Sequence, residues 1–354
     1  MSLTVRAAPV GDPIDPADLA SDSSVADLTA ATGRVLSAYP RLRQVISTEV
    51  TPLVELPAPP GVRVLGKAEW HNPTGSVKDR TAIALVVDAL DEHLRAGGDP
   101  AHPPELLEYS GGSLADSLVP LCAAVGAPLH VVLSDATPPA AVARLREHGV
   151  SVDLVDRDQG FIAVMARGLA LAAAQPQWRL LYQHRNLSNV AVHVSRTGAE
   201  LVAQLSELGV RPDVWVASIG SGGTLAGVAH ALRRHWPGLP VVGVTPAELP
   251  YGSMLPPNGL PKYAGSGGLG HGICQPFVAA LAPPIEFLTV SYDAAKLGMR
   301  ELRDTTGLRI GSSAAANWLV SRQLGATLPA GSVVVTVLPS AGTDAEWDAV
   351  DRLG

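Results

Sequence analysis

The feature that most constrains the fold is an alternation of short apolar runs with longer helical stretches, which begins near Val62. In the stretch 139–148, Val142 and Leu145 lie three apart on one helical face, and Gly149 follows as a stop signal. Continuous apolar strands separated by helices are typical of a mostly parallel sheet that is covered on both faces. The pattern therefore predicts an α/β protein. The apolar runs cover residues 62–65, 129–133, 152–155, 214–219, 241–244 and 333–338, and further helices are expected over 188–209 and 224–235.

Length and composition narrow the classes of protein. A chain of 354 residues suits one large α/β unit or two closely packed ones, and 47% hydrophobic against 17% charged residues favours a large core. A net charge of -7 without basic runs argues against nucleic acid as a partner. No apolar run reaches the roughly 20 residues that span a bilayer, and no secretion signal is visible, so we expect a cytoplasmic protein. Cys122 and Cys274 predict neither a disulfide framework nor a metal site.

The segment 67–80 carries a lysine at a position suited to covalent chemistry. A strand ends, a turn containing Pro and Gly follows, and Ser76 is placed to cap the helix that carries Lys78. In the first turn of a helix the dipole disfavours a protonated amine, and the neutral amine is the form that attacks an aldehyde. We interpret Lys78 as a Schiff-base nucleophile. The alternative for an isolated lysine is a surface residue beside Asp79.

A glycine-rich turn follows the predicted strand 214–219 and opens the next predicted helix. Small residues there leave backbone N–H groups free to surround a phosphate at a helix N-terminus. A dinucleotide fingerprint is disfavoured because Leu225 stands where it requires a third glycine, and no Gly-Lys-Ser/Thr follows to make a Walker motif. Taken alone, such a turn is also compatible with a tight connection. The predicted phosphate-binding residues are Gly220, Ser221, Gly222, Gly223 and Thr224.

Together, the lysine segment and the glycine-rich turn resemble the cysteine synthase and cystathionine β-synthase family of fold type II pyridoxal-phosphate enzymes. The resemblance covers about residues 48–342. It implies a two-domain fold like that of the tryptophan synthase β-subunit, with pyridoxal 5'-phosphate bound to Lys78 and contacted by Asn72. It also implies that Ser312 faces the pyridine nitrogen, with Ser313 as the fallback assignment. Independently of the resemblance, we interpret His193 as a helix-packing residue rather than a catalyst.

Further motifs are assigned to the substrate side by the same resemblance. The loop after a strand ending near Tyr109 departs from the family's Ser-Gly-Asn-Thr-Gly, because Gly112 replaces the Asn. Its hydroxyls and N–H groups are still expected to hold the substrate carboxylate. In the glycine-rich loop 268–272, His271 has two open interpretations, a structural residue or one that faces the substrate. The predicted substrate-binding residues are Ser110, Gly111, Gly112, Ser113, Gln183 and His271.

The resemblance also implies an activity and an organisation. The expected reaction is β-replacement on serine or an O-activated serine, O-acetyl- or O-phosphoserine, through an aminoacrylate, with a thiol, sulfide or amine as nucleophile in a biosynthetic pathway. The alternatives are α,β-elimination to pyruvate and ammonia, or a cofactor-binding protein with little catalysis. We expect a homodimer with an N-terminal arm over 1–50, a larger cofactor-binding domain over 51–71 plus 183–354, and a smaller mobile substrate domain over 72–182.

Overall fold

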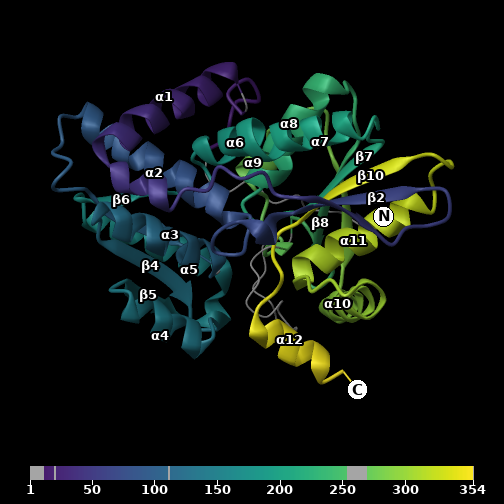
Figure 1. The fold of residues 1–354 in the computed structure, drawn as a ribbon. Coiled ribbons are helices and arrows are strands. Elements are labelled where there is room, and N and C mark those ends of the chain that lie inside the picture. Colours follow the sequence, from purple (N-terminus) through teal and green to yellow (C-terminus); the bar gives the residue numbers. More distant parts are fainter. Residues whose placement is uncertain (1–11, 20, 111, 253–268, 354) are drawn as a thin grey trace.

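The computed structural model describes residues 12–19, 21–110, 112–252 and 269–353 (Figure 1). Gly111 and Gly268 of the predicted substrate-side loops lie outside the described residues. In the described part of the chain, the strands form two sheets, one of six strands and one of four. Ten strands and their intervening helices confirm the predicted α/β class for these residues.

The six-stranded sheet has the strand order β1-β2-β10-β7-β8-β9. All neighbours pair in parallel except β1, which runs antiparallel to β2. Strand β10 lies near the centre, where Val335 pairs with Leu65 of β2 on one side and with Trp215 of β7 on the other. The strands are β1 Leu53–Leu56, β2 Arg63–Ala68, β7 Val214–Ser218, β8 Val241–Pro246, β9 Glu286–Val290 and β10 Val333–Leu338.

The four-stranded sheet is entirely parallel and has the order β5-β4-β3-β6. Its strands are β3 Glu105–Tyr109, β4 Leu129–Ser134, β5 Ser151–Val155 and β6 Trp178–Leu180. They come from residues 105–180, whereas the six-stranded sheet uses residues 53–68 and 214–338. We propose that the two predicted domains, 72–182 and 51–71 plus 183–354, follow this division.

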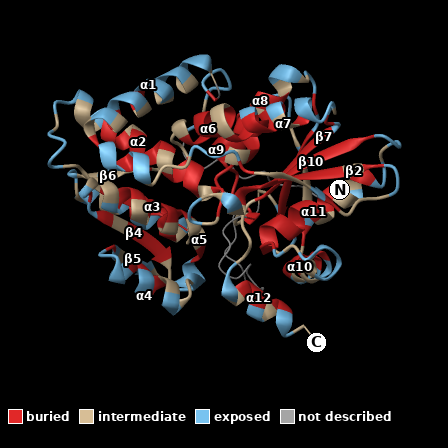
Figure 2. Cartoon of the chain, viewed as in Figure 1, coloured by how far each residue is buried: buried red, intermediate tan, exposed pale blue. Residues whose placement is uncertain are grey.

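Helices cover both sheets, as Figure 1 shows for α2, α3 and α5 on the left and for α10 and α11 on the right. Both faces of the central strands are therefore buried (Figure 2). Trp215 packs in the core beneath α7 and α8, while its neighbour Val216 packs in a second core beneath α10 and α11. This two-residue alternation within an apolar strand is what a doubly covered sheet requires.

The helices agree with the predicted pattern except in two places. Residues 22–38 of the predicted N-terminal arm form helix α1, whose Ala31 and Val35 pack into the core under the four-stranded sheet. The helix predicted over 188–209 is interrupted by a π-helical segment, His193–Gly198. The helices are α1 Asp22–Ala38, α2 Lys78–Arg95, α3 Ser113–Val125, α4 Pro139–Glu147, α5 Gly160–Ala174, α6 Ser188–Val192, α7 Ala199–Glu207, α8 Gly223–His235, α9 Pro276–Ala279, α10 Tyr292–Thr306, α11 Ser312–Gly325 and α12 Asp344–Asp351.

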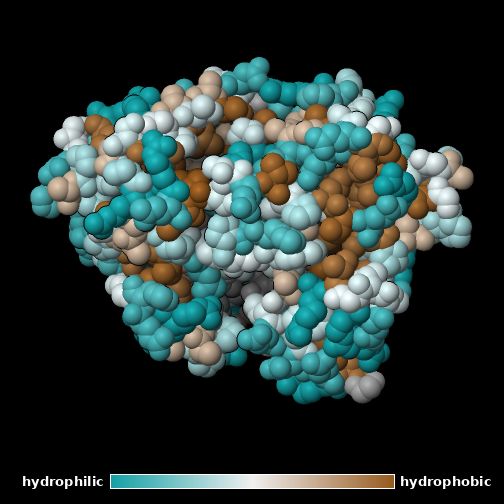
Figure 3. Space-filling model, in the orientation of Figure 1, coloured by the Kyte–Doolittle hydropathy of each residue, from teal (hydrophilic) through white to brown (hydrophobic). Residues whose placement is uncertain are grey.

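On the face in view, hydrophilic side chains cover α4 and α12, and hydrophobic side chains gather on the right, in the region of β2 and β10 (Figure 3). Among the described helices, none is both long enough and apolar enough to cross a membrane.

Candidate active site

A cavity lies where segments from both sheets meet, at the carboxyl ends of parallel strands. Ser110 follows β3 of the four-stranded sheet, and Gly220 follows β7 of the six-stranded sheet. Ligands of open parallel sheets bind at such ends, because the loops there lead into helix N-termini. The lining residues are Ser76, Val77, Lys78, Ser110, Gly112, Ser113, Leu114, Phe161, Gln183, His184, Gly220, Ser221, Gly270, His271, Gln275, Ser313, Pro339, Ser340, Thr343 and Glu346.

Lys78 lines this cavity as the first residue of α2. The residue at the cap position is Val77, but the Ser76 hydroxyl still accepts a hydrogen bond from the Lys78 N–H at 3.2 Å. Because burial among protein atoms disfavours the ammonium form, the pKa of Lys78 is lowered to about 8. Burial thus lowers the pKa of this amine and favours its neutral, nucleophilic form.

The glycine-rich turn joins β7 to α8 beside Lys78. Gly220 and Ser221 line the same cavity as Lys78, and an adjoining cavity is lined by Lys78 together with Gly220, Gly222 and Thr224. Gly222 has a φ of +89° and occupies the left-handed region, in which glycine is favoured. Gly223 begins α8 behind the cavity wall and is not among its lining residues.

These residues fit pyridoxal phosphate on two counts. The turn presents backbone N–H groups and two hydroxyls at the N-terminus of a 13-residue helix, which suits a phosphate. Lys78 places an amine of lowered pKa in the same wall, which suits an aldehyde. Both groups of the cofactor therefore find a partner of matching chemistry in the lining of one cavity.

Two predicted cofactor contacts have their side chains engaged elsewhere. The Asn72 amide donates to the backbone oxygen and the carboxylate of Glu69, both at 2.8 Å, and Asn72 is not among the lining residues. The Ser312 hydroxyl is fully buried and donates to Glu346. Ser313, the fallback assignment, does line the cavity.

The predicted carboxylate loop forms the wall contributed by the four-stranded sheet. Ser110, Gly112 and Ser113 all line the cavity, and Ser113 is the first residue of α3. The Ser110 hydroxyl accepts a hydrogen bond from the Gly112 N–H at 3.0 Å. Gln183 also lines the cavity, and its amide donates to the backbone oxygen of Tyr109 at 2.9 Å. The structure thus brings the described members of the predicted substrate set together.

Aromatic and imidazole rings complete this wall. The His271 ring stacks on Phe161, with ring centroids 4.4 Å apart and planes 13° apart. His184 stacks on Tyr109 and pairs with its hydroxyl through Nδ1 at 3.0 Å. Burial lowers the pKa of His184 to about 3, so its ring is neutral at ordinary pH.

Several residues that line the cavity were not predicted as site residues, among them Phe161, His184 and Gln275. His184 was available as a candidate because it directly follows Gln183, a predicted substrate residue. Phe161 and Gln275 come from the start of α5 and from the residue before α9, and neither segment carries a local signal of function. They reach the cavity only through the packing of distant segments.

Charged residues of the lysine motif lie behind the cavity rather than in its wall. Arg80 pairs with Glu69 at 2.7 Å and with Glu200 at 2.6 Å, and Lys67 pairs with Glu200 at 2.8 Å. Although burial opposes its ionisation, the hydrogen bonds from Arg80 and Lys67 hold the pKa of Glu200 at about 2. This ion network connects β2, α2 and α7, and therefore helps to hold the helix that carries Lys78.

Comparison with known proteins identifies the class. The family model "Pyridoxal-phosphate dependent enzyme" matches residues 46–340, so the chain belongs to this family. Within it, the chain is 30% identical to cysteine synthase B of Salmonella typhimurium, over 82% of this chain and 90% of that protein. It is 29% identical to N-(2-amino-2-carboxyethyl)-L-glutamate synthase of Ralstonia nicotianae, over 84% and 88%. The O-acetylserine-dependent cystathionine β-synthase of Helicobacter pylori superposes with a TM-score of 0.72 and 26% identity, over 84% of this chain and 94% of that one.

The predictions of a fold type II enzyme of the cysteine synthase family and of pyridoxal phosphate as its cofactor are thereby confirmed.

Proposed function

We propose that this chain catalyses β-replacement on an O-activated serine, with O-acetylserine or O-phosphoserine as the amino-acid substrate and a small sulfur or nitrogen nucleophile. The observation that carries the proposal is the cavity at Lys78, which is lined by residues of the donor-rich turn 220–224 and by Ser110 and Ser113. Relatives whose names include cysteine synthase and O-acetylserine-dependent synthase support the same reaction class.

Each group of residues has a proposed role. The turn 220–224 holds the cofactor phosphate, Lys78 holds the cofactor, and Ser110 with Ser113 holds the substrate carboxylate. When bound, the cofactor supplies the electron sink that makes the Cα proton of the amino acid acidic. Ser313 is proposed to face the pyridine nitrogen, because it lines the cavity.

Lys78 is the proposed base. Its amine takes the Cα proton as the acyloxy or phosphate group leaves Cβ with the electrons of the C–O bond. It returns a proton to Cα after the nucleophile has bonded to Cβ. The net change exchanges the leaving group for the nucleophile, and the proton released by the nucleophile accompanies the leaving group. Neither oxidation nor reduction is involved.

The test compares wild type with Lys78→Ala. Wild-type protein loaded with pyridoxal phosphate should retain the cofactor covalently after borohydride reduction, on the peptide that contains Lys78. The variant should lose this link and its turnover. With O-acetylserine, products are measured in the presence and absence of sulfide. An amino-acid product that depends on sulfide supports replacement. Pyruvate with ammonia would indicate elimination instead. Covalently bound cofactor without either product would indicate a cofactor-binding protein with little catalysis.

Location and assembly remain proposals. From the family resemblance we propose that the enzyme is cytoplasmic and forms a homodimer. Its other proposed partners are its small-molecule substrates. Light scattering of the purified protein tests the dimer, for which we expect twice the mass of the 36.6 kDa chain.

A further inference from the structure

We propose that Asn189 and His193 fix the direction of the hydroxyl protons of Ser221 and Thr224, so that both protons point toward the cofactor phosphate. The proposal rests on the phosphate assignment made above for the turn 220–224. Both residues are fully buried behind that turn, Asn189 on α6 and His193 at the start of the π-helical segment. Neither lines a cavity around Lys78, so they would act through the two hydroxyls as positioning residues.

The orientation of the Asn189 amide follows from its contact with a backbone carbonyl. The Gln183 oxygen lies 2.8 Å from Nδ2, and a carbonyl only accepts hydrogen bonds, so the atom facing it must be the NH2 nitrogen. The same nitrogen donates its second hydrogen to the Ser221 hydroxyl oxygen at 2.9 Å. On the other side, Oδ1 accepts from the Thr81 hydroxyl at 3.0 Å.

The tautomer of His193 follows from the same chain of contacts. The Thr81 proton is already used toward Asn189, so the 3.3 Å contact of Thr81 with His193 requires Nε2 to carry the hydrogen. That N–H is shared with the Thr224 hydroxyl oxygen at 3.2 Å. Burial, with the charges of Arg80 and Lys78, holds the pKa of His193 well below its usual range. Nδ1 is therefore bare and accepts from the Thr197 hydroxyl at 2.8 Å.

The oxygen atoms of both hydroxyls thus accept a hydrogen bond from a buried side chain. Ser221 accepts from Asn189 and, more weakly, from the Gly223 N–H at 3.5 Å, while Thr224 accepts from His193. Their own protons remain for a ligand in the cavities that these residues line. A ligand that only accepts hydrogen bonds, such as a phosphate dianion, matches two fixed donors.

Two glycines of α8 allow this helix to lie close to Asn189 and His193. A Cβ atom at Gly223 would lie 2.5 Å from Asn189 Oδ1, and one at Gly227 would lie 2.6 Å from the Cβ atom of His193. Glycine at both positions therefore lets α8 approach α6 and the π-helical segment closely enough for these hydrogen bonds. Local π-helical geometry is frequent at functional sites, and here it begins at His193.

The experiment compares two ligands that differ only in the phosphate. Affinities of apoprotein for pyridoxal phosphate and for pyridoxal are measured in wild type, Thr224→Val, His193→Phe and the double variant. Each single variant should lose about tenfold or more in affinity for pyridoxal phosphate and little for pyridoxal, since each disturbs a hydrogen bond to a charged group. The double variant should lose no more than the weaker-binding single variant, because His193 acts through Thr224.

Matched variants serve as controls. Thr224→Ser keeps the hydroxyl, and His193→Gln keeps an N–H donor, so both should retain most of the preference for the phosphorylated ligand. Equal losses for the two ligands, or losses that multiply in the double variant, would overturn the proposal.

The tautomer of His193 can also be measured in the wild-type protein, which requires no variant to fold. The ring nitrogens of His193, observed by 15N NMR after histidine labelling, should show a protonated Nε2 and a bare Nδ1. The opposite tautomer would refute the proton directions. Wild-type protein that lacks a covalent cofactor on Lys78 would instead refute the proposed function.

Discussion

At the scale of single residues, the ionisation of Lys78 sets the conditions for loading the cofactor. Burial disfavours the charged amine and lowers the pKa to about 8 from the usual 10.5, so the neutral form is present at lower pH than for an ordinary lysine. The rate at which apoprotein binds pyridoxal phosphate covalently should rise with pH and level off above about 8. Absorbance-monitored mixing over a pH series measures this rate. A rise that continues toward 10.5 would show that the amine is solvated.

The hydroxyls of Ser110 and Ser113 carry the second prediction. Each hydrogen bond to a charged carboxylate contributes about 1.5–3 kcal/mol, so removing both in Ser110→Ala with Ser113→Ala should weaken amino-acid binding about 100-fold or more. Both residues line the cavity, and Ser113 begins α3. Titration of the cofactor-loaded variant with O-acetylserine, followed by its spectrum, measures the loss. Cofactor retention is the control and should stay at the wild-type level. Unchanged substrate affinity would place the carboxylate elsewhere.

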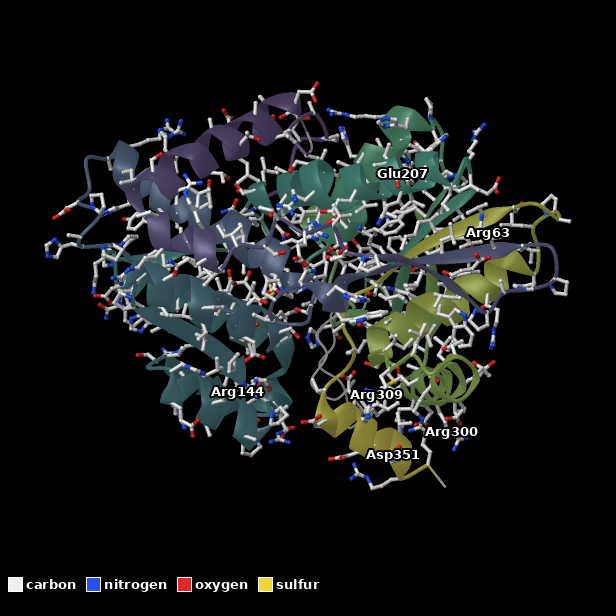
Figure 4. The ribbon with its side chains drawn as sticks, viewed as in Figure 1. Arg63, Arg144, Glu207, Arg300, Arg309 and Asp351 are labelled. Carbon is white, nitrogen blue, oxygen red and sulfur yellow. The ribbon has the colours of Figure 1, made fainter. Side chains whose placement is uncertain are left out.

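At the scale of elements, the ion network of Arg80 joins α2 to β2 and α7. Arg80→Met leaves the buried carboxylates of Glu69 and Glu200 with too little positive charge, which should cost about 3–5 kcal/mol of the free energy of unfolding. The matched control is Arg63→Met, because Arg63, at the start of β2 (Figure 4), pairs with the exposed Glu55 at 2.8 Å and should cost about 1 kcal/mol or less. Urea denaturation measures both. Equal losses would mean that burial does not strengthen the network.

At the scale of the whole molecule, one cavity depends on loops from both sheets, so its ligand should stabilise the entire chain. At a hundredfold excess over the dissociation constant, pyridoxal phosphate should add about 2.7 kcal/mol to the free energy of unfolding. Gly222→Asp should remove most of this gain, because it places a carboxylate in the phosphate turn at a φ of +89°, with its Cβ 2.7 Å from Val278. Each protein is compared with and without cofactor, which separates binding from the strain of the variant. A full gain in the variant would exclude this turn as the phosphate site.

Much of the architecture followed from local pattern. The apolar run 333–338 became β10 with the predicted bounds, and the runs at 129–133 and 214–219 became β4 and β7 within one residue. Lys78 was expected in the first turn of a helix and is the first residue of α2. These features depend on neighbours a few residues away, because strands and helices impose side-chain periods of 2 and 3.6.

Only the tertiary structure decided which side chains face the cavity. A shift of one residue along a helix turns the side chain by about 100°, and here Ser313 lines the cavity while Ser312 is held by Glu346. The sequence itself determined the alternation of strands and helices, the lysine segment and the glycine-rich turn, because each is encoded within a few adjacent residues. The folded chain decided that Phe161, His184 and Gln275 line the same cavity as Lys78, since the packing of the two sheets brings together residues that are far apart in the chain.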